Sequence, residues 1–223
     1  MPSPTSSSPA AERARRRRRG AAVATALVVL AGPAAAAPCA TSERCLRALA
    51  AAHGDTRTLD ARFTQTKHVS LLDEPLVSSG RFRFRAPDHV RLDVETPQPA
   101  TILIAGPAVH IPSLPEGEQR ALAAGPMAAL FSELGALMAG NLATPPADLR
   151  VAAQGSADGI AVTLTPTTAD SRRMFQTMVL RFAGTPPTIR ALRLDDGLGD
   201  HLEVELHEVR RNVELPDAVF APP

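Results

Sequence analysis

Residues 79–95 read Ser-Gly-Arg-Phe-Arg-Phe-Arg-Ala-Pro-Asp-His-Val-Arg-Leu-Asp-Val-Glu, and this stretch decides the fold class. Apolar and charged residues alternate on both sides of a turn made by Ala86, Pro87 and Asp88. A period of two places successive side chains on opposite faces of a β-strand. The stretch therefore predicts two antiparallel strands, each with one apolar and one polar face. Counted from Gly80, the apolar side chains fall at even offsets, so we expect them on one face of both strands.

The same alternation recurs along the chain and predicts further strands at residues 59–64, 162–165, 178–182 and 201–207. Turn-forming residues separate these segments, and Asp196-Gly197 is typical of a hairpin turn. Closely spaced strands with short turns predict an antiparallel meander. Ahead of the strands, residues 43–53 have helical apolar spacing, with Ser42 as the expected N-cap and Gly54 as the stop.

A second helix is predicted from Pro126 onward, because proline favours the first helical turn. Its opposite face is mostly alanine and glycine, so this helix is either a core helix covered on several sides or a lid over an apolar cavity. The apolar residues at helical spacing are Met127, Leu130, Phe131, Leu134, Leu137 and Met138.

The N-terminal residues 1–36 have the three-part layout of a secretory signal. Arginines at positions 13–19 precede a short apolar run at 21–31, and small residues around Ala36 suit signal peptidase. The run is shorter than the roughly 20 strongly apolar residues that span a bilayer. We therefore expect cleavage after Ala36 and one domain over residues 37–223, which acts outside the cytoplasm.

Cleavage would leave 18 basic against 22 acidic residues, a net charge of −4. A nucleic-acid-binding surface needs a basic face, so we expect no nucleic-acid partner. Cys39 and Cys45 follow the signal, and in an oxidising compartment they either form a disulfide or remain thiols. Pro38 is unsuitable before a lipidated cysteine, so we expect no lipid anchor at Cys39.

Motifs for catalysis or metal binding are missing from the sequence: it has no HExxH pair, GxSxG elbow, phosphate-binding glycine loop or CxxC. His201 and His207 share the polar face of one predicted strand with several glutamates, which we interpret as a solvated face rather than a metal site. We expect no cofactor, no metal and no enzymatic activity.

Several segments, in order, resemble the LolA family of outer-membrane lipoprotein carriers. Phe63-Thr64-Gln65 resembles the F-x-Q of its first strand, and residues 79–84 resemble its S/Q-G-x-hydrophobic-x-hydrophobic strand. Residues 86–92 resemble its R-P segment, Leu164-Thr165-Pro166 its L-x-P, and residues 207–212 with Phe220 its closing pattern. The resemblance runs from about Leu59 to Phe220.

The resemblance implies a mainly β fold with helices (α+β), in which a helical lid caps an incomplete antiparallel β-barrel. It also implies a periplasmic carrier that shields lipoprotein acyl chains between the inner and the outer membrane. Its partners would be an inner-membrane release complex and an outer-membrane acceptor, and we expect a monomer. The acyl-chain cavity would be lined by Phe63, Phe82, Phe84, Val90, Leu92, Val94, Ile102, Ile104, Met127, Leu130, Leu134 and Met138.

One departure concerns the R-P pair, whose arginine points inward in the family and helps to hold the lid closed. Here Ala86 takes that place, and Leu92 replaces the tryptophan that follows. Two other functions therefore stay open at this stage: a carrier of lipid or hydrophobic metabolites that serves an inner-membrane exporter, and an envelope sensing or binding module of the same fold.

Overall fold

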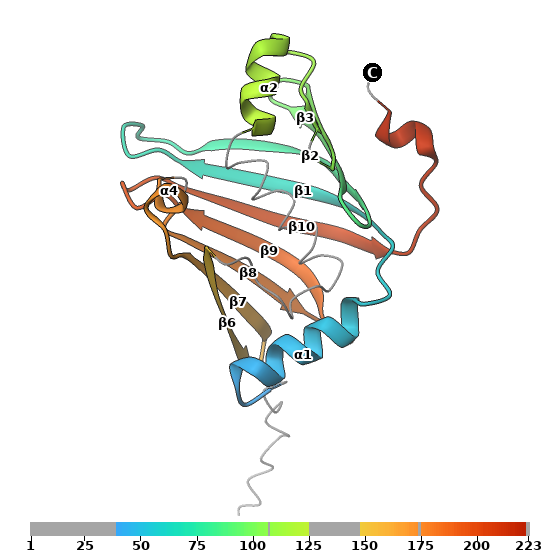
Figure 1. Cartoon of the computed structure of the whole chain (residues 1–223), viewed down its shortest axis with the longest axis vertical. Coiled ribbons are helices and arrows are strands. Elements are labelled where there is room, and N and C mark those ends of the chain that lie inside the picture. The colour runs from blue at the N-terminus through green and yellow to red at the C-terminus, as the bar shows by residue number, and fades with distance from the viewer. Residues whose placement is uncertain (1–38, 107, 125–147, 174, 222–223) are drawn as a thin grey trace, which may run out of the picture. The chain divides into compact units, whose positions relative to one another are not determined.

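The structure, a computed structural model, describes residues 39–106, 108–124, 148–173 and 175–221. Ten strands form one antiparallel sheet in the order β5-β4-β3-β2-β1-β10-β9-β8-β7-β6 (Figure 1). Their bounds are β1 Thr58–His68, β2 Leu76–Arg85, β3 His89–Thr96, β4 Ala100–Ala105, β5 Ala108–His110, β6 Leu149–Ser156, β7 Gly159–Pro166, β8 Thr177–Ala183, β9 Thr188–Asp195 and β10 His201–Arg211. The helices are α1 Ser42–His53, α2 Glu116–Ala124, α4 Ala169–Arg172 and the 3₁₀ helix η1 Asp217–Phe220.

The sheet consists of two meanders that meet in the middle. Strands β1 to β5 follow one another to one edge, β6 to β10 return from the other edge, and β10 pairs with β1. Among the described residues the edge strands β5 and β6 do not pair with each other, so the sheet stays open. The predicted incomplete antiparallel barrel is thereby confirmed.

The two faces of the sheet differ in polarity. We call the face that carries Phe63 and Phe82 the cavity face, and the opposite one the outer face. Phe82 lies directly opposite Leu92, and Phe84 opposite Val90, so the apolar positions of β2 and β3 share a face as the even offsets predict. On the other half of the sheet, β7 and β8 are buried at every second position, which also fits the predicted alternation.

Helix α1 packs against β6, at the end of the sheet formed by β6 to β8 (Figure 1). Its buried side chains are Cys45, Leu49 and His53, and the His53 ring meets the Phe182 ring edge-on with centroids 5.4 Å apart. Because α1 covers this end, the sheet has a closed core there. The largest fully buried side chains of the core are Phe63, Phe84, Phe175, Phe182, Leu49, Leu59, Ile104, Ile160, Leu164, Met178 and Leu180.

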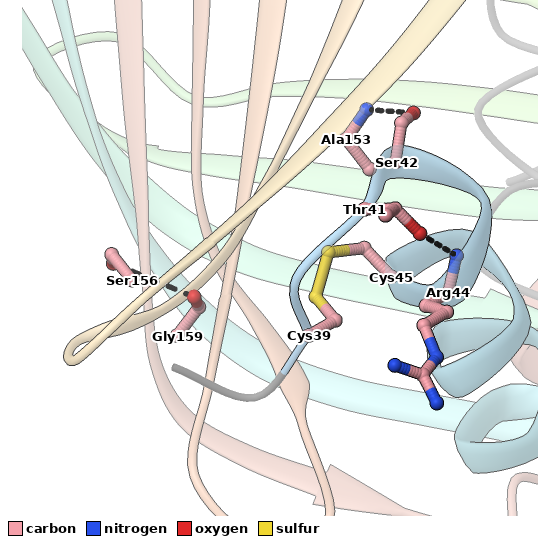
Figure 2. The surroundings of a disulfide bond; sticks show 8 residues. All are labelled: Cys39, Thr41, Ser42, Arg44, Cys45, Ala153, Ser156 and Gly159. Atoms are coloured by element: carbon pink, nitrogen blue, oxygen red, sulfur yellow. Dashed lines mark hydrogen bonds between the residues drawn. A yellow bond between two sulfur atoms is a disulfide. The ribbon is translucent and has the colours of Figure 1, made fainter. Parts of the chain in front are cut away.

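The start of α1 differs from the prediction by one residue. Thr41, not Ser42, is the N-cap: its hydroxyl accepts a hydrogen bond from Arg44 N at 3.4 Å (Figure 2). Ser42 Oγ instead accepts from Ala153 N of the edge strand β6 at 2.8 Å, because the helix begins beside that edge. A disulfide joins Cys39 to Cys45 across the same turn (Figure 2). The helix ends at His53, just before Gly54, as predicted.

The C-terminal residues return to the outer face of the sheet near β3. Phe220 of η1 is buried there, with the Arg85 guanidinium 4.6 Å above its ring and the His89 ring edge-on at 5.8 Å. Arg85 also pairs with Asp217 at 2.8 Å. Two predicted segments, the secretory signal at 1–36 and the apolar helix from Pro126 to Met138, lie outside the described residues.

Candidate functional site

A cavity of about 500 Å³ lies on the cavity face, within the size range of ligand-binding pockets. Side chains from seven strands, β1 to β4 of one meander and β8 to β10 of the other, surround it, and most of them are aliphatic or aromatic. The lining residues are Phe63, Gln65, Lys67, Phe82, Val90, Leu92, Ile102, Ile104, Met178, Ile189, Leu192, Leu194, Asp196, Asp200, His201, Leu202, Val204 and Leu206. Such a surface binds apolar groups by excluding water and offers few directional contacts.

Six of the residues predicted for an acyl-chain cavity line this space: Phe63, Phe82, Val90, Leu92, Ile102 and Ile104. Phe84 lies on the same face, but it is 0% exposed in the core opposite Leu59 and is not a lining residue. Val94 pairs with Gly80 and Ala100 and is also not a lining residue. The other four, Met127, Leu130, Leu134 and Met138, lie outside the described residues.

The second half of the lining comes from β8, β9 and β10 and was not predicted. The alternation of Leu202, Val204 and Leu206 with polar residues predicts that these three side chains share one apolar face. The alternation does not predict that β10 pairs with β1. In the structure this pairing places Phe63 opposite Leu206 and Gln65 opposite Val204. This pairing joins the two apolar surfaces into one cavity.

Gly80 makes room for an aromatic wall of the cavity. A Cβ at this position would lie 1.9 Å from Asp93 O and 2.9 Å from Cε1 of Phe63. The glycine stands at a register shift between β2 and β3 and directly opposite Phe63 of β1. Glycine at position 80 therefore allows both the Asp93 backbone and the Phe63 ring to approach β2 closely.

One end of the cavity is polar, where β1 ends and the β9–β10 hairpin turns. Lys67, Asp196, Asp200 and His201 line this end, and we call it the polar end. The Asp196-Gly197 hairpin turn is confirmed, and Gly197 has a φ of +81°. A Cβ there would also meet the Gln176 side chain at 2.2 Å, so glycine is needed on both grounds.

Hydrogen bonds hold the polar end in place. Asp196 Oδ1 accepts from Leu198 N at 2.7 Å and from Asp200 N at 3.1 Å. Asp200 Oδ1 accepts from Ser70 N of the β1–β2 hairpin at 2.8 Å, which joins the two hairpin tips. The backbone hydrogen bond from Ser70 holds the pKa of Asp200 below its usual value, with a further contribution from Lys67 and His201. The carboxylate is therefore ionised over the neutral pH range.

The joined hairpin tips also carry apolar side chains in water. Leu71 on the β1–β2 tip is 91% exposed and Leu198 on the β9–β10 tip is 87% exposed. Leucines exposed in isolation are ordinary, but these two stand on neighbouring tips beside the polar end of an apolar cavity.

The outer face carries an arginine–carboxylate network instead of apolar groups. Arg81 donates two hydrogen bonds of 2.7 Å to Asp60, whose side chain is 3% exposed, and Arg210 donates a third. The hydrogen bonds from Arg81 are the main reason that the pKa of Asp60 lies below its usual value, although burial acts to raise it. Beside it, Asp93 accepts from Arg83 and Arg91. On the predicted polar face, arginines and carboxylates are thus paired with one another.

His201 and His207, which share one predicted strand, have different contacts in the structure. His201 does not join a ligand cluster but stacks on His68 at 4.3 Å between ring centroids, and His207 lies 3.9 Å from Glu205. Over the described parts of the chain, no group of three or more histidine, cysteine, aspartate or glutamate side chains could hold a metal ion.

An arginine does tie a helix to the sheet, but from a position other than Ala86. Ala86 packs against the core and its N–H donates to Arg57 O at 2.8 Å. Arg211 of β10, which lies opposite Leu59, donates from Nη2 to Ala52 O near the end of α1 at 2.6 Å. This bond satisfies a carbonyl in the last turn of the helix.

In the described part of the structure, no helix has both the length and the apolar character needed to cross a bilayer. Residues 54–223 match the family described as outer membrane lipoprotein carrier protein LolA. An outer-membrane lipoprotein carrier protein of Dechloromonas aromatica (strain RCB) is 30% identical over 169 residues, which cover 74% of this chain and 77% of that protein.

Solved structures similar to this chain include a LolA superfamily protein of Nitrosomonas europaea (10% identity, TM-score 0.42, 82% of this chain and 99% of that one). The lipoprotein LppX of Mycobacterium tuberculosis is another (12% identity, TM-score 0.39, 77% and 94%). The family match spans most of the chain, and the Dechloromonas relative is 30% identical over 74% of it. The chain therefore belongs to the LolA family of outer membrane lipoprotein carrier proteins.

Proposed function

We propose that this protein carries the acyl chains of lipoproteins through the periplasm, from the inner to the outer membrane, in the cavity described above. The observation that carries the proposal is the continuous apolar lining contributed by both meanders, on one face of an open sheet. The relative from Dechloromonas, named as a lipoprotein carrier, supports the same role. In this role the protein is a binding protein and not an enzyme.

The physical task of such a carrier is to keep hydrocarbon out of water. Each CH₂ group exposed to water costs about 0.8 kcal/mol, so even a short stretch of chain contributes several kcal/mol when it is buried. A lining of Leu, Ile, Val and Phe side chains shields a chain without directional bonds. The cargo can therefore slide and be released to an acceptor, which a rigid polar clamp would prevent.

The remaining parts of the proposal come from the sequence. Residues 1–36 would direct export and be removed near Ala36, which leaves a monomeric carrier over residues 37–223. The apolar helix that includes Met127, Leu130, Leu134 and Met138 would cover the cavity, where flexible methionines suit chains of different shape. An inner-membrane release complex would load the cavity and an outer-membrane acceptor would empty it.

Photo-crosslinking in cells tests the proposal. A photoreactive phenylalanine analogue replaces Phe82, which lines the cavity, and a matched variant carries it at Arg62, which is exposed on the outer face. After irradiation, the captured species are identified by mass spectrometry. We expect lipid-modified proteins at position 82, attached through their acylated ends, and none at position 62.

Two results would contradict the proposal in different ways. Capture of free lipids alone at position 82 would keep the cavity as a lipid site but reject lipoproteins as the cargo. Equal capture at positions 82 and 62, or none at either, would reject the cavity as the cargo site.

A further inference from the structure

The polar end of the cavity contains both signs of charge next to an apolar lining. Lys67 supplies a cation, Asp196 and Asp200 supply carboxylates, and His201 stands beside them. An apolar chain needs none of these groups. The combination therefore fits a ligand with a charged head attached to hydrocarbon.

Lys67 is the only lysine among the 24 basic residues of the chain. It lies on the cavity face of β1, opposite Leu76 on one side and Leu202 on the other. The arginines on the outer face of β1 to β3 are already engaged by carboxylates or backbone carbonyls: Arg62, Arg81, Arg83, Arg85 and Arg91. An exposed ammonium between two leucines, at the edge of an apolar cavity, suits a phosphate as a flexible point charge.

The two carboxylates are positioned before any ligand arrives. The hydrogen bonds from Leu198 N, Asp200 N and Ser70 N hold them on the hairpin turn. A carboxylate has about four acceptor sites, and these bonds use Oδ1 of each residue, so acceptor capacity remains for a ligand ammonium. Because Asp200 is ionised near neutral pH, it presents a negative charge to that ligand.

The signs decide between classes of head group. A neutral head would gain nothing from Lys67 or from the carboxylates. A purely anionic head would meet Lys67 but also two negative charges nearby, and such a juxtaposition disfavours binding. A zwitterionic head carries a phosphate for Lys67 and an ammonium for Asp196 and Asp200, so every charge has a partner.

We propose that the polar end binds the head group of a zwitterionic phospholipid, with its phosphate at Lys67, its ammonium at Asp196 and Asp200, and its acyl chains along the apolar lining. This inference rests on the proposed function in one respect, since it places hydrocarbon in the same cavity. It goes beyond that function because it adds a phospholipid to the cargo.

Binding of four lipids with identical short acyl chains tests the inference. The probes are phosphatidylethanolamine and phosphatidylcholine (zwitterionic), phosphatidylglycerol (anionic) and diacylglycerol (neutral), titrated into the purified mature protein below their critical micelle concentrations. We expect both zwitterionic lipids to bind more tightly than the other two. Lys67→Met should weaken zwitterionic binding by roughly fivefold, which corresponds to about 1 kcal/mol, and should weaken diacylglycerol binding much less, because that lipid carries no phosphate.

Matched variants separate the head group from the fold. Lys67→Arg keeps the cation and should retain the preference for zwitterionic heads. Asp200→Asn keeps an acceptor for Ser70 N but removes the negative charge, so it should weaken that preference. Equal affinity for all four lipids, or tightest binding of phosphatidylglycerol, would overturn the head-group site and leave the carrier function intact. If none of the four lipids binds, the cavity does not hold acyl chains, and both the inference and the proposed function fail.

Discussion

At the scale of single residues, Asp60 shows how the outer face of a thin, open sheet is held together. Its carboxylate is buried beneath three arginines that come from β2 and β10, the two neighbours of β1. It thus connects the strands on both sides of the junction between the meanders. A buried charge is stable only when it is paired, so removing these arginines would destabilise the folded protein.

The variant Asp60→Asn should lower the free energy of unfolding by about 2 kcal/mol at pH 7, because the charge-assisted hydrogen bonds from Arg81 and Arg210 lose their anionic acceptor. The pKa of Asp60 is lower in the folded protein than its usual value, so its stabilising effect is present at neutral pH and is lost as the pH falls below about 4. The difference between wild type and variant should therefore shrink in acid. Urea unfolding of both proteins at pH 7 and near pH 3 measures it, and a difference that is as large at the lower pH would contradict the account.

At the scale of elements, the start of α1 and strand β6 form one unit. The disulfide between Cys39 and Cys45 closes the turn before the helix, and Ser42 accepts from Ala153 N on the sheet edge (Figure 2). Gly155 of β6 lies against Cys39, where a Cβ would be 2.6 Å from Cys39 O. The N-terminal segment thus covers part of an edge whose backbone groups would otherwise be available to another chain.

Replacing both cysteines with alanine should lower the free energy of unfolding by about 2 kcal/mol, the value expected for so short a closed loop. Amide hydrogen exchange should rise in α1 and β6 and stay unchanged in β1 to β3, because those strands do not contact the bridge. Wild-type protein under reducing conditions is the control, since reduction opens the bridge without removing the two cysteine side chains. A uniform rise in exchange over the whole sheet would show that the disulfide does not stabilise α1 and β6 locally.

At the scale of the whole sheet, the cavity exists because β10 pairs with β1 and the sheet remains open. Neither meander alone encloses an apolar space: β1 to β4 supply one wall, and β8 to β10 supply the other. At the cavity, apolar side chains such as Leu92 and Ile102 pack against the core but stay partly exposed, whereas the α1 end is filled. An apolar ligand that occupies the cavity should therefore stabilise the folded state.

A short-chain diacylglycerol at a hundred times its dissociation constant should add about 2.7 kcal/mol and raise the thermal midpoint by about 5 to 10 °C. The variant Leu192→Glu, which places a charge in the lining, should show a much smaller rise, because burying that carboxylate beside hydrocarbon is costly. Calorimetry of both proteins with and without the lipid gives the comparison. An equal rise in the two proteins would mean that the lipid binds elsewhere.

Local pattern was enough to predict much of the fold. The alternation in residues 79–95 predicts both strands and the face that Phe82 and Val90 share, because side-chain direction in a strand depends only on position along it. The resemblance to the LolA family assigned the apolar side chains of these strands to a cavity, and six of those residues line it. Phe84 satisfies the same pattern and yet lies in the core, since depth within a face depends on what covers it.

The sequence by itself determined the helix from residue 43 to 53 and six of the ten described strands, β1, β2, β3, β7, β8 and β10, with their apolar faces. All of these follow from interactions between residues close along the chain. Only the tertiary structure decided that β10 lies beside β1, which brings Leu202, Val204 and Leu206 to Phe63 and places Lys67 beside Asp200. These residues are separated by more than a hundred positions, so their meeting depends on the register and closure of the whole sheet. Periodicity carries no information about either.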